Sequence, residues 1–291
     1  MSSDIRVLAP AKINIGLRVL PVRKDGFHGI ESVFLRIPLY DILTVRRQGF
    51  GKNTCVVECE GMVLPEDNTL TKAYSAFCKI TGVTDSVFVY LEKKLPAGAG
   101  LGAGSSDAAS LVNALEKIFD TELTVADRMQ IASVTGSDVF FFMDSHAMQT
   151  GCAVVSGRGE IVEAIPSRQD LFFVMICPEV HSSTKEAYHL VDQWYAPTWP
   201  WSGPVMSALA EEFTRSVRDW NFLNSFTEPL AERYPVIEEA LQDLMRGGAG
   251  FVQMSGSGSA VYGVFDSSAA SKNALLMLDK KWKRCFEFAS V

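Results

Sequence analysis

The segment Pro96–Asp107 limits what this chain can fold into more than any other part of the sequence. It reads Pro-Ala-Gly-Ala-Gly-Leu-Gly-Ala-Gly-Ser-Ser-Asp, with a glycine at every second position from Gly98 to Gly104. A predicted strand at 87–91 precedes it, and the apolar residues after Ser106 recur at the spacing of an amphipathic helix. Glycines let a backbone approach an anion closely, and a helix N-terminus offers free N–H groups and a positive dipole end. The segment therefore predicts a binding site for a di- or triphosphate.

Two common phosphate-binding motifs do not fit this segment. No Gly-Lys-Ser or Gly-Lys-Thr follows the glycines, so the segment is not a Walker A loop. The alternate spacing of the glycines also differs from the Gly-x-Gly-x-x-Gly pattern of a dinucleotide-binding turn. A flexible turn before a capped helix would use the same residue types, and the segment alone leaves this alternative open.

Two further segments accompany the glycine-rich one. Pro10–Asn14 reads Pro-Ala-Lys-Ile-Asn, and Gln253–Gly258 reads Gln-Met-Ser-Gly-Ser-Gly. Alternating glycine and serine expose successive N–H groups, which indicates a second backbone cradle, although a simple turn has the same composition. In this order and spacing the three segments resemble the three motifs of the GHMP kinase family, which includes galactokinase, homoserine kinase and mevalonate kinase. The resemblance covers nearly the whole chain and implies an ATP-dependent kinase for a small metabolite.

Shorter features resemble one branch of that family. They are Lys24–His28, Gly136–Val139 and Gly157–Glu160. Members of this branch transfer the γ-phosphate of ATP to the 2-hydroxyl of 4-diphosphocytidyl-2-C-methyl-D-erythritol, in the methylerythritol phosphate route of isoprenoid biosynthesis. We therefore expect a phosphotransferase with this alcohol as acceptor. Two alternatives stay open: a GHMP kinase for another alcohol, and a non-catalytic nucleotide-binding protein of the same fold.

The resemblance implies a role for each matching position. Asp138 matches the catalytic aspartate and Lys12 matches its partner, with Asn14 beside them. In the acceptor site, Phe27 and Tyr188 match the aromatic residues that sandwich the cytosine, and His28 matches the residue that hydrogen-bonds it. The expected acceptor or phosphate cradle consists of Ser255, Gly256, Ser257 and Gly258. The chain departs from the family pattern at Phe27, where Tyr is common, and at Gly29, where an acidic residue is common.

The expected ATP site is built around the glycine-rich segment. Two residues outside that segment are expected to reach the nucleotide: Asn68, near the adenine, and Lys93. The phosphate loop itself is predicted to comprise Pro96, Ala97, Gly98, Ala99, Gly100, Leu101, Gly102, Ala103, Gly104, Ser105 and Ser106.

The expected chemistry depends more on positioning and charge than on covalent intermediates. An alcohol is a weak nucleophile at neutral pH, so a carboxylate that accepts its proton assists the reaction. Asp138 is the candidate base, and Lys12 either neutralises the γ-phosphate or keeps Asp138 ionised. We expect Mg²⁺ to bridge the phosphates of ATP, with protein ligands that the sequence does not identify. Taken alone, Asp138 could also cap the start of a strand, and Lys12 could be a surface charge.

The pattern of predicted elements indicates an α+β protein with two lobes. The chain has 291 residues, which exceeds the usual size of one compact domain. Strands dominate the first third, and the stretch 136–143 is predicted to begin a second strand-rich region. Helices are predicted at 124–134, after a Thr124 cap, and at several later positions. The resemblance implies a GHMP kinase N-terminal ATP-binding domain at 1–157 and a ferredoxin-like C-terminal domain at 158–291.

Charge and composition exclude several other classes. The net charge is −7 and the isoelectric point is about 5.2, whereas a nucleic-acid-binding protein usually has a basic surplus. The first residues lack the pattern of a signal peptide, and the longest apolar run, Leu171–Cys177, is too short to cross a bilayer. We expect a cytoplasmic protein with reduced cysteines, a monomer or weak homodimer that acts on a small molecule without nucleic acid or membrane.

Overall fold

The computed structural model describes residues 4–50, 53–180, 182–195 and 205–290. These residues form two compact units, and neither unit is continuous in sequence. The first unit comprises residues 1–11, 39–97 and 102–148, and the second comprises 12–38, 98–101 and 149–291. The predicted division into family domains at residue 157 stays a prediction, because compact units and family domains need not share boundaries.

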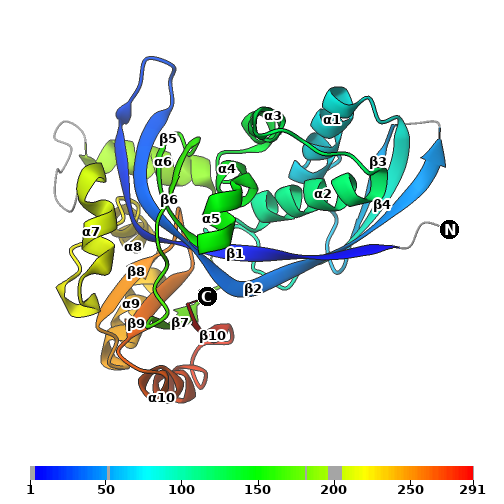
Figure 1. Cartoon of the computed structure of the whole chain (residues 1–291). Helices are drawn as coiled ribbons and strands as arrows, with labels where there is room; N and C mark the ends of the chain where they lie inside the picture. The colour runs from blue at the N-terminus through cyan, green and yellow to red at the C-terminus, as the bar shows by residue number, and fades with distance from the viewer. Residues whose placement is uncertain (1–3, 51–52, 181, 196–204, 291) are drawn as a thin grey trace. The chain divides into compact units, whose positions relative to one another are not determined.

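The first unit consists of a small sheet and a group of helices packed on one another (Figure 1). In the sheet, β3 runs parallel to β4, and β4 pairs antiparallel with the second half of β2, from Ile42 to Phe50. The elements that lie wholly or partly in this unit are β1 (Ile5–Val22), β2 (His28–Phe50), β3 (Cys55–Cys59), α1 (Thr69–Thr81), β4 (Asp85–Glu92), α2 (Ala103–Phe119), α3 (Val125–Thr135), α4 (Val139–Met143) and α5 (Ser145–Thr150).

Side-chain caps determine where two of these helices begin. Helix α1 starts after Asn68, whose side chain accepts hydrogen bonds from the N–H groups of Leu70 and Thr71. Helix α3 starts after the predicted cap Thr124, and Asp127 completes a reciprocal capping box. Each such cap satisfies N–H groups that have no partner inside the helix and stabilises it by about 1 kcal/mol.

The prediction that residues 136–143 begin a strand is wrong, because Val139–Met143 form helix α4. Valine and phenylalanine favour strands when a half-buried sheet surface is available to them. Here Val139, Phe141 and Phe142 are buried instead against α2 and α3, and this packing overrides the local preference.

The second unit contains a four-stranded antiparallel sheet in the order β10-β7-β9-β8 (Figure 1). Since these four strands follow one another in the chain as β7, β8, β9 and β10, the order is that of a ferredoxin-like fold, as predicted. The second unit also contains strand pairs outside this sheet. Residues 30–35 of β2 pair with β5, and β5 pairs with β6. The further elements of this unit are β5 (Cys152–Gly157), β6 (Ile161–Ala164), β7 (Phe172–Ile176), α6 (Thr184–Tyr195), α7 (Leu209–Thr214), α8 (Thr227–Arg233), α9 (Pro235–Arg246), β8 (Phe251–Met254), β9 (Val261–Phe265), α10 (Ser268–Leu278) and β10 (Cys285–Ala289), with short 3-10 turns at Met206–Ala208 and Val217–Asp219.

An apolar core joins the sheet and helices of the second unit. Val174 and Val261 from the sheet meet Ile237 and Leu244 from α9, and all four side chains are buried. Burial of one such side chain is worth about 1.5–3 kcal/mol relative to its exposure. The same core includes Leu17 of β1, whose backbone N–H and C=O bond to the segment 223–225. The core therefore fixes β1 just beyond Lys12 and Asn14.

The α+β class is confirmed. All six cysteines are free thiols, and burial raises the pKa of Cys152 to about 12, so this group stays protonated at neutral pH. Within the described ranges, no helix combines the length and the apolar character that a bilayer-spanning segment needs.

Candidate active site

Parts of all three sequence motifs meet in the second unit. The backbone N–H of Asn14 donates to the hydroxyl of Ser255 at 3.2 Å, and that hydroxyl donates to the carbonyl oxygen of Gly100 at 2.9 Å. The N–H of Lys12 donates to the carbonyl oxygen of Leu101 at 3.0 Å. One serine side chain therefore links the first motif to the third and the third to the glycine-rich segment.

Glycine at position 100 is required by the close approach of the third motif. A Cβ atom built on Gly100 would lie 2.0 Å from the carbonyl oxygen of Ser255, well inside van der Waals contact. The backbone at Gly100 also has a φ of +75°, which strains a residue that carries a side chain. The glycine at position 100 thus allows two backbone segments to pack directly on each other.

Lys12 is a buried residue of this site and not the surface charge that the sequence left possible. Its side chain is 3% exposed, its Nζ donates to Oδ1 of Asn14 at 2.7 Å, and it lies 4.4 Å from the ring centre of Phe34. The amide of Asn14 donates to the hydroxyl of Ser32 at 3.0 Å. The ammonium group is therefore held in one orientation by a hydrogen-bonded amide and the face of an aromatic ring.

The predicted phosphate-binding serines lie in the first turn of α2, in the first unit. Ser106 is fully buried, and its hydroxyl has no hydrogen-bond partner among the described residues. A buried polar atom without a partner costs free energy unless a ligand or water satisfies it. Together with the free N–H groups of the helix start, this hydroxyl provides the chemistry that an anion needs.

Asp138 directly precedes α4, also in the first unit. It has helical backbone angles, φ −70° and ψ −14°, and is half-buried. The structure assigns to it no capping hydrogen bond on α4, in the part of the chain that is described. Asp138 and Lys12 belong to different units, so their predicted pairing stays a prediction.

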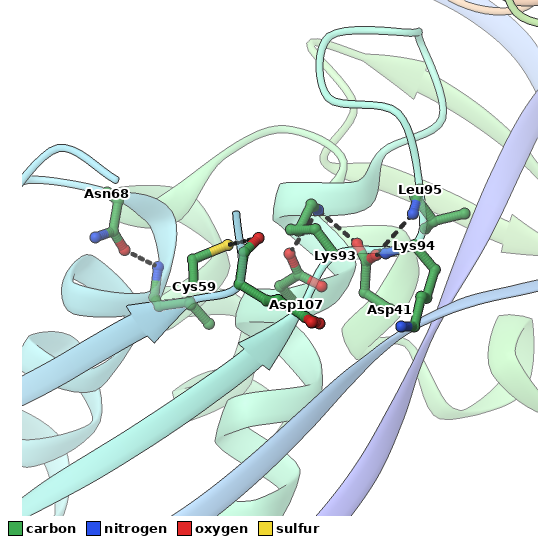
Figure 2. Close-up of polar contacts among 9 residues, drawn as sticks. Asp41, Cys59, Asn68, Lys93, Lys94, Leu95 and Asp107 are labelled. Atoms are coloured by element: carbon green, nitrogen blue, oxygen red, sulfur yellow. Dashed lines mark hydrogen bonds and ion pairs between the residues drawn. The ribbon is translucent and has the colours of Figure 1, made fainter. Parts of the chain in front are cut away.

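The two expected nucleotide contacts outside the loop already have protein partners. The amide of Asn68 caps α1 and also donates to the carbonyl oxygen of Pro65 at 2.8 Å. The ammonium of Lys93 bonds to the carboxylates of Asp41 and Asp107 (Figure 2). Contact of either residue with a nucleotide stays a prediction.

The three ring-bearing residues expected to bind cytosine lie in the second unit. His28 Nδ1 donates to the carbonyl oxygen of Leu20 at 2.7 Å, and its ring stacks on Tyr188 with centroids 5.0 Å apart. Phe27 is 50% exposed, and the guanidinium of Arg158 covers its ring at 3.6 Å. His28 and Tyr188 thus form a preassembled pair, while Phe27 presents an accessible aromatic ring.

The glycine that departs from the family pattern has a local steric reason. A Cβ atom at Gly29 would lie 3.1 Å from a side-chain carbon of Leu20 and 3.5 Å from the carbonyl oxygen of Gly157. A longer acidic side chain would therefore require a shift of its neighbours at this position.

Three supporting residues were missed by the sequence analysis. Asn224 donates from its amide to the carbonyl oxygens of Met254 and Gly256, both at 2.8 Å, and the hydroxyl of Tyr262 donates to the carbonyl oxygen of Asn14 at 2.8 Å. Ser32 is the third, through its bond to Asn14. All three are buried. They lie in no recognisable motif. The one signal that the sequence offers for them is a polar residue inside a predicted strand or loop.

No group of three or more His, Cys, Asp or Glu side chains that could hold a metal ion occurs among the described residues. Magnesium in phosphotransferases is bound through one or two carboxylates, water and the phosphates of the substrate, and needs no such cluster. A magnesium ion that arrives with ATP therefore stays a prediction.

Comparison with known proteins assigns the chain to a family. A family model described as the GHMP kinases N terminal domain matches residues 68–148, and one described as GHMP kinases C terminal matches residues 205–284. The 4-diphosphocytidyl-2-C-methyl-D-erythritol kinase of Treponema pallidum is 38% identical over 97% of both chains. That of Chlorobium limicola is 35% identical over 94% of this chain and 93% of the relative.

Solved structures agree with this assignment. A crystal structure of 4-(cytidine 5'-diphospho)-2C-methyl-D-erythritol kinase covers 98% of both chains at 28% identity, with a TM-score of 0.76. Homoserine kinase from Cytophaga hutchinsonii has the same fold, with a TM-score of 0.71 at 18% identity over the full length of this chain and 95% of the other. The chain therefore belongs to the GHMP kinase family, within its group of 4-diphosphocytidyl-2-C-methyl-D-erythritol kinases.

Proposed function

We propose that this protein transfers the γ-phosphate of ATP to the 2-hydroxyl of 4-diphosphocytidyl-2-C-methyl-D-erythritol. The observation that carries the proposal is the meeting of Lys12, Asn14, Gly100 and Ser255 in one hydrogen-bonded group. These residues come from three distant parts of the sequence, and each belongs to a motif that the family shares. The group holds a buried cation beside the glycine-rich segment, and a polyphosphate requires such a positive charge.

The proposed roles follow from the chemistry of each group. Asp138 accepts the proton of the attacking hydroxyl, and Lys12 neutralises charge on the transferred phosphate. Asn14 orients Lys12 through their 2.7 Å hydrogen bond. The phosphate loop and Mg²⁺ hold the remaining charge of ATP, and Mg²⁺ supplies Lewis-acid stabilisation of the phosphate oxygens.

The cytosine of the acceptor is proposed to bind beside His28. The Tyr188 ring already stacks on His28, and Phe27 offers an exposed ring for a planar base. Arg158 lies over Phe27 and brings a positive charge to the place where a nucleoside diphosphate would enter. Aromatic stacking of a base is worth about 1–3 kcal/mol, enough to select a nucleotide-linked alcohol over a free one.

An assay of ADP release with a panel of alcohols tests the proposal. We expect turnover with 4-diphosphocytidyl-2-C-methyl-D-erythritol and none with homoserine, mevalonate or galactose. Asp138→Asn should lower kcat by at least about 100-fold, because a general base contributes that much, and should leave ATP binding intact. Asp120→Asn is the matched control, since Asp120 is an exposed residue at the end of α2. Unchanged turnover in Asp138→Asn would remove this residue from the mechanism, and turnover of another alcohol instead would reassign the acceptor.

Two expectations accompany the proposal. The enzyme is proposed to work in the cytoplasm, as a monomer or weak homodimer, on a substrate that carries cytidine diphosphate. Sedimentation at the concentration used in the assay measures the oligomeric state directly.

A further inference from the structure

Two buried aspartates and a partly buried lysine of the first unit form a cluster, Asp41–Lys93–Asp107 (Figure 2). The ammonium of Lys93 bonds to Oδ2 of Asp41 at 2.5 Å and to Oδ2 of Asp107 at 3.1 Å. Asp41 is fully buried and Asp107 is 3% exposed. The cluster thus contains two buried carboxylates and one cation whose side chain is 12% exposed.

The cluster joins the two ends of the phosphate loop. Oδ1 of Asp41 accepts the backbone N–H groups of Lys94 at 2.7 Å and Leu95 at 2.9 Å, directly before the loop begins at Pro96. Asp107 lies directly after the loop, as the fifth residue of α2. Figure 2 shows Lys93 reaching toward both carboxylates, so one side chain closes the segment from 93 to 107. The geometry of the loop ends therefore depends on these three residues.

The two carboxylates are not equivalent. Asp41 receives three hydrogen bonds, from Lys93 and from two backbone N–H groups. Asp107 receives one, from Lys93, and its Oδ1 has no hydrogen-bond partner among the described residues. Asp107 is accordingly the carboxylate of the cluster with an oxygen left over to carry a proton.

The surroundings favour that proton. Burial raises the pKa of Asp107, Lys93 lowers it, and the charge of Asp41 raises it again, to about 7 overall. The Cys59 thiol at the end of β3 also interacts electrostatically with all three residues of the cluster. The neighbours of Asp107 on α2, Ser105, Ser106 and Ala108, carry no charge, and α1 presents the Thr69 hydroxyl to Gly104.

We propose that the Asp41–Lys93–Asp107 cluster positions the phosphate loop, and that Asp107 takes up a proton when ATP binds. The inference rests on the proposed function, since ATP is the ligand. Asp107 directly follows Ser106, the last residue of the phosphate loop, so a phosphate bound there would bring a second negative charge close to this carboxylate. A phosphate at this helix start also repels the buried negative charge, which favours the protonated form. When Asp107 is neutral, Lys93 pairs with Asp41 alone, and the phosphates bind at the start of α2 without a negative charge beside them.

Calorimetry of ATP binding at about pH 8, in buffers that differ in their enthalpy of ionisation, counts the protons taken up. We expect the intact protein to take up more protons per ATP than Asp107→Asn, which should still bind ATP. Asp170→Asn is the matched control: Asp170 is 66% exposed and pairs with Arg168, and this variant should match the intact protein. Because the ligand is the same in all three titrations, protons exchanged by ATP itself cancel.

A second variant keeps the test decisive if Asp107→Asn folds poorly. Asp41→Asn retains an oxygen that can accept the two N–H groups but removes the competing charge, so Lys93 pairs with an ionised Asp107 and the extra uptake should also disappear. The affinity of the intact protein for ATP should also fall as pH rises through the alkaline range, and this fall should be absent in both variants. Equal proton counts in the intact protein and the variants would overturn the inference. Failure of the intact protein to bind ATP would instead overturn the proposed function.

Discussion

The replacement Gly100→Ala tests whether the phosphate loop and the third motif depend on each other. The added methyl would lie 2.0 Å from the carbonyl oxygen of Ser255 and 3.2 Å from the backbone nitrogen of Gly258. Both neighbours are backbone atoms, and a carbon normally lies about 3.5 Å from them, so one segment must move by more than about 1 Å. The hydrogen bond from the Ser255 hydroxyl to the Gly100 carbonyl would be distorted by the same movement.

The chain contains a control that separates backbone strain from this collision. Gly82, at the end of α1, has the same φ of +75°, and a Cβ there would meet nothing within 4 Å. Gly82→Ala should cost about 1 kcal/mol, since the left-handed conformation costs about 1–2 kcal/mol and the stiffer unfolded chain returns about 0.4–1 kcal/mol. Gly100→Ala adds an overpacking cost of about 1–3 kcal/mol, so we expect about 2–4 kcal/mol in total.

Urea unfolding and steady-state kinetics measure the two effects. We expect Gly100→Ala to be less stable than Gly82→Ala by at least about 1 kcal/mol. A displacement of about 1 Å at a site that orients reactants is enough to lower turnover by about 100-fold, whereas Gly82→Ala should retain its kcat. Equal free energies of unfolding and equal kcat values for the two variants would refute the close approach of Gly100 to Ser255. They would also refute the argument that glycine at position 100 serves the packing of two backbone segments.

Three other perturbations follow from the same geometry. The folded state binds the Asp107 proton more tightly than the unfolded chain, with a pKa of about 7 against 3.8. The contribution of this proton to stability is therefore lost as the pH rises from about 4 to about 7. Asp107→Asn should remove ~3 kcal/mol of the loss that falls between pH 5 and pH 8, measured by urea unfolding at these two pH values. Asn224→Ala leaves two buried carbonyls without donors and should cost about 1–3 kcal/mol, with a raised KM for substrate. Arg158→Ala should raise the KM for the cytidine-linked alcohol and leave the KM for ATP unchanged, because Arg158 stacks on Phe27.

Local signals explain which parts of the fold were predictable. The cap at Thr124 and the helix after Ser106 were read correctly, because each depends on residues within one or two helical turns. Strands β8 and β10 were missed, since four or five residues with modest alternation are recognisable only once their sheet partners are known. Strand β1 continues through Pro10, although proline commonly interrupts a strand. Proline is tolerated where a strand leaves an N–H group unpaired.

The candidate site shows the same division between local and distant information. The motifs at Lys12, Gly100 and Ser255 could be recognised because each combines unusual residue types within a few positions. The residues that support these motifs could not be recognised. Asn224 donates hydrogen bonds to backbone carbonyls some 30 positions away in the chain, and Tyr262 donates to the carbonyl of Asn14 from 248 positions away. A buried side chain that satisfies a carbonyl leaves no pattern in the sequence, because any residue with a suitable donor could serve.

The burial of Lys12 shows why residue type alone could not decide its role. A lysine between apolar strands is usually a solvated charge, and removing an ammonium from water costs several kcal/mol. Lys12 is 3% exposed, and the oxygen of Asn14 and the ring of Phe34 offset this cost. Hydrogen bonds to Ser32 and Tyr262 hold Asn14 in place. A site that only stabilised the fold would gain more from an apolar residue of similar volume, since such replacements of buried charges are often neutral or stabilising. The retained charge therefore indicates a function: an ammonium held rigidly and largely dehydrated interacts more strongly with a phosphate than one in water.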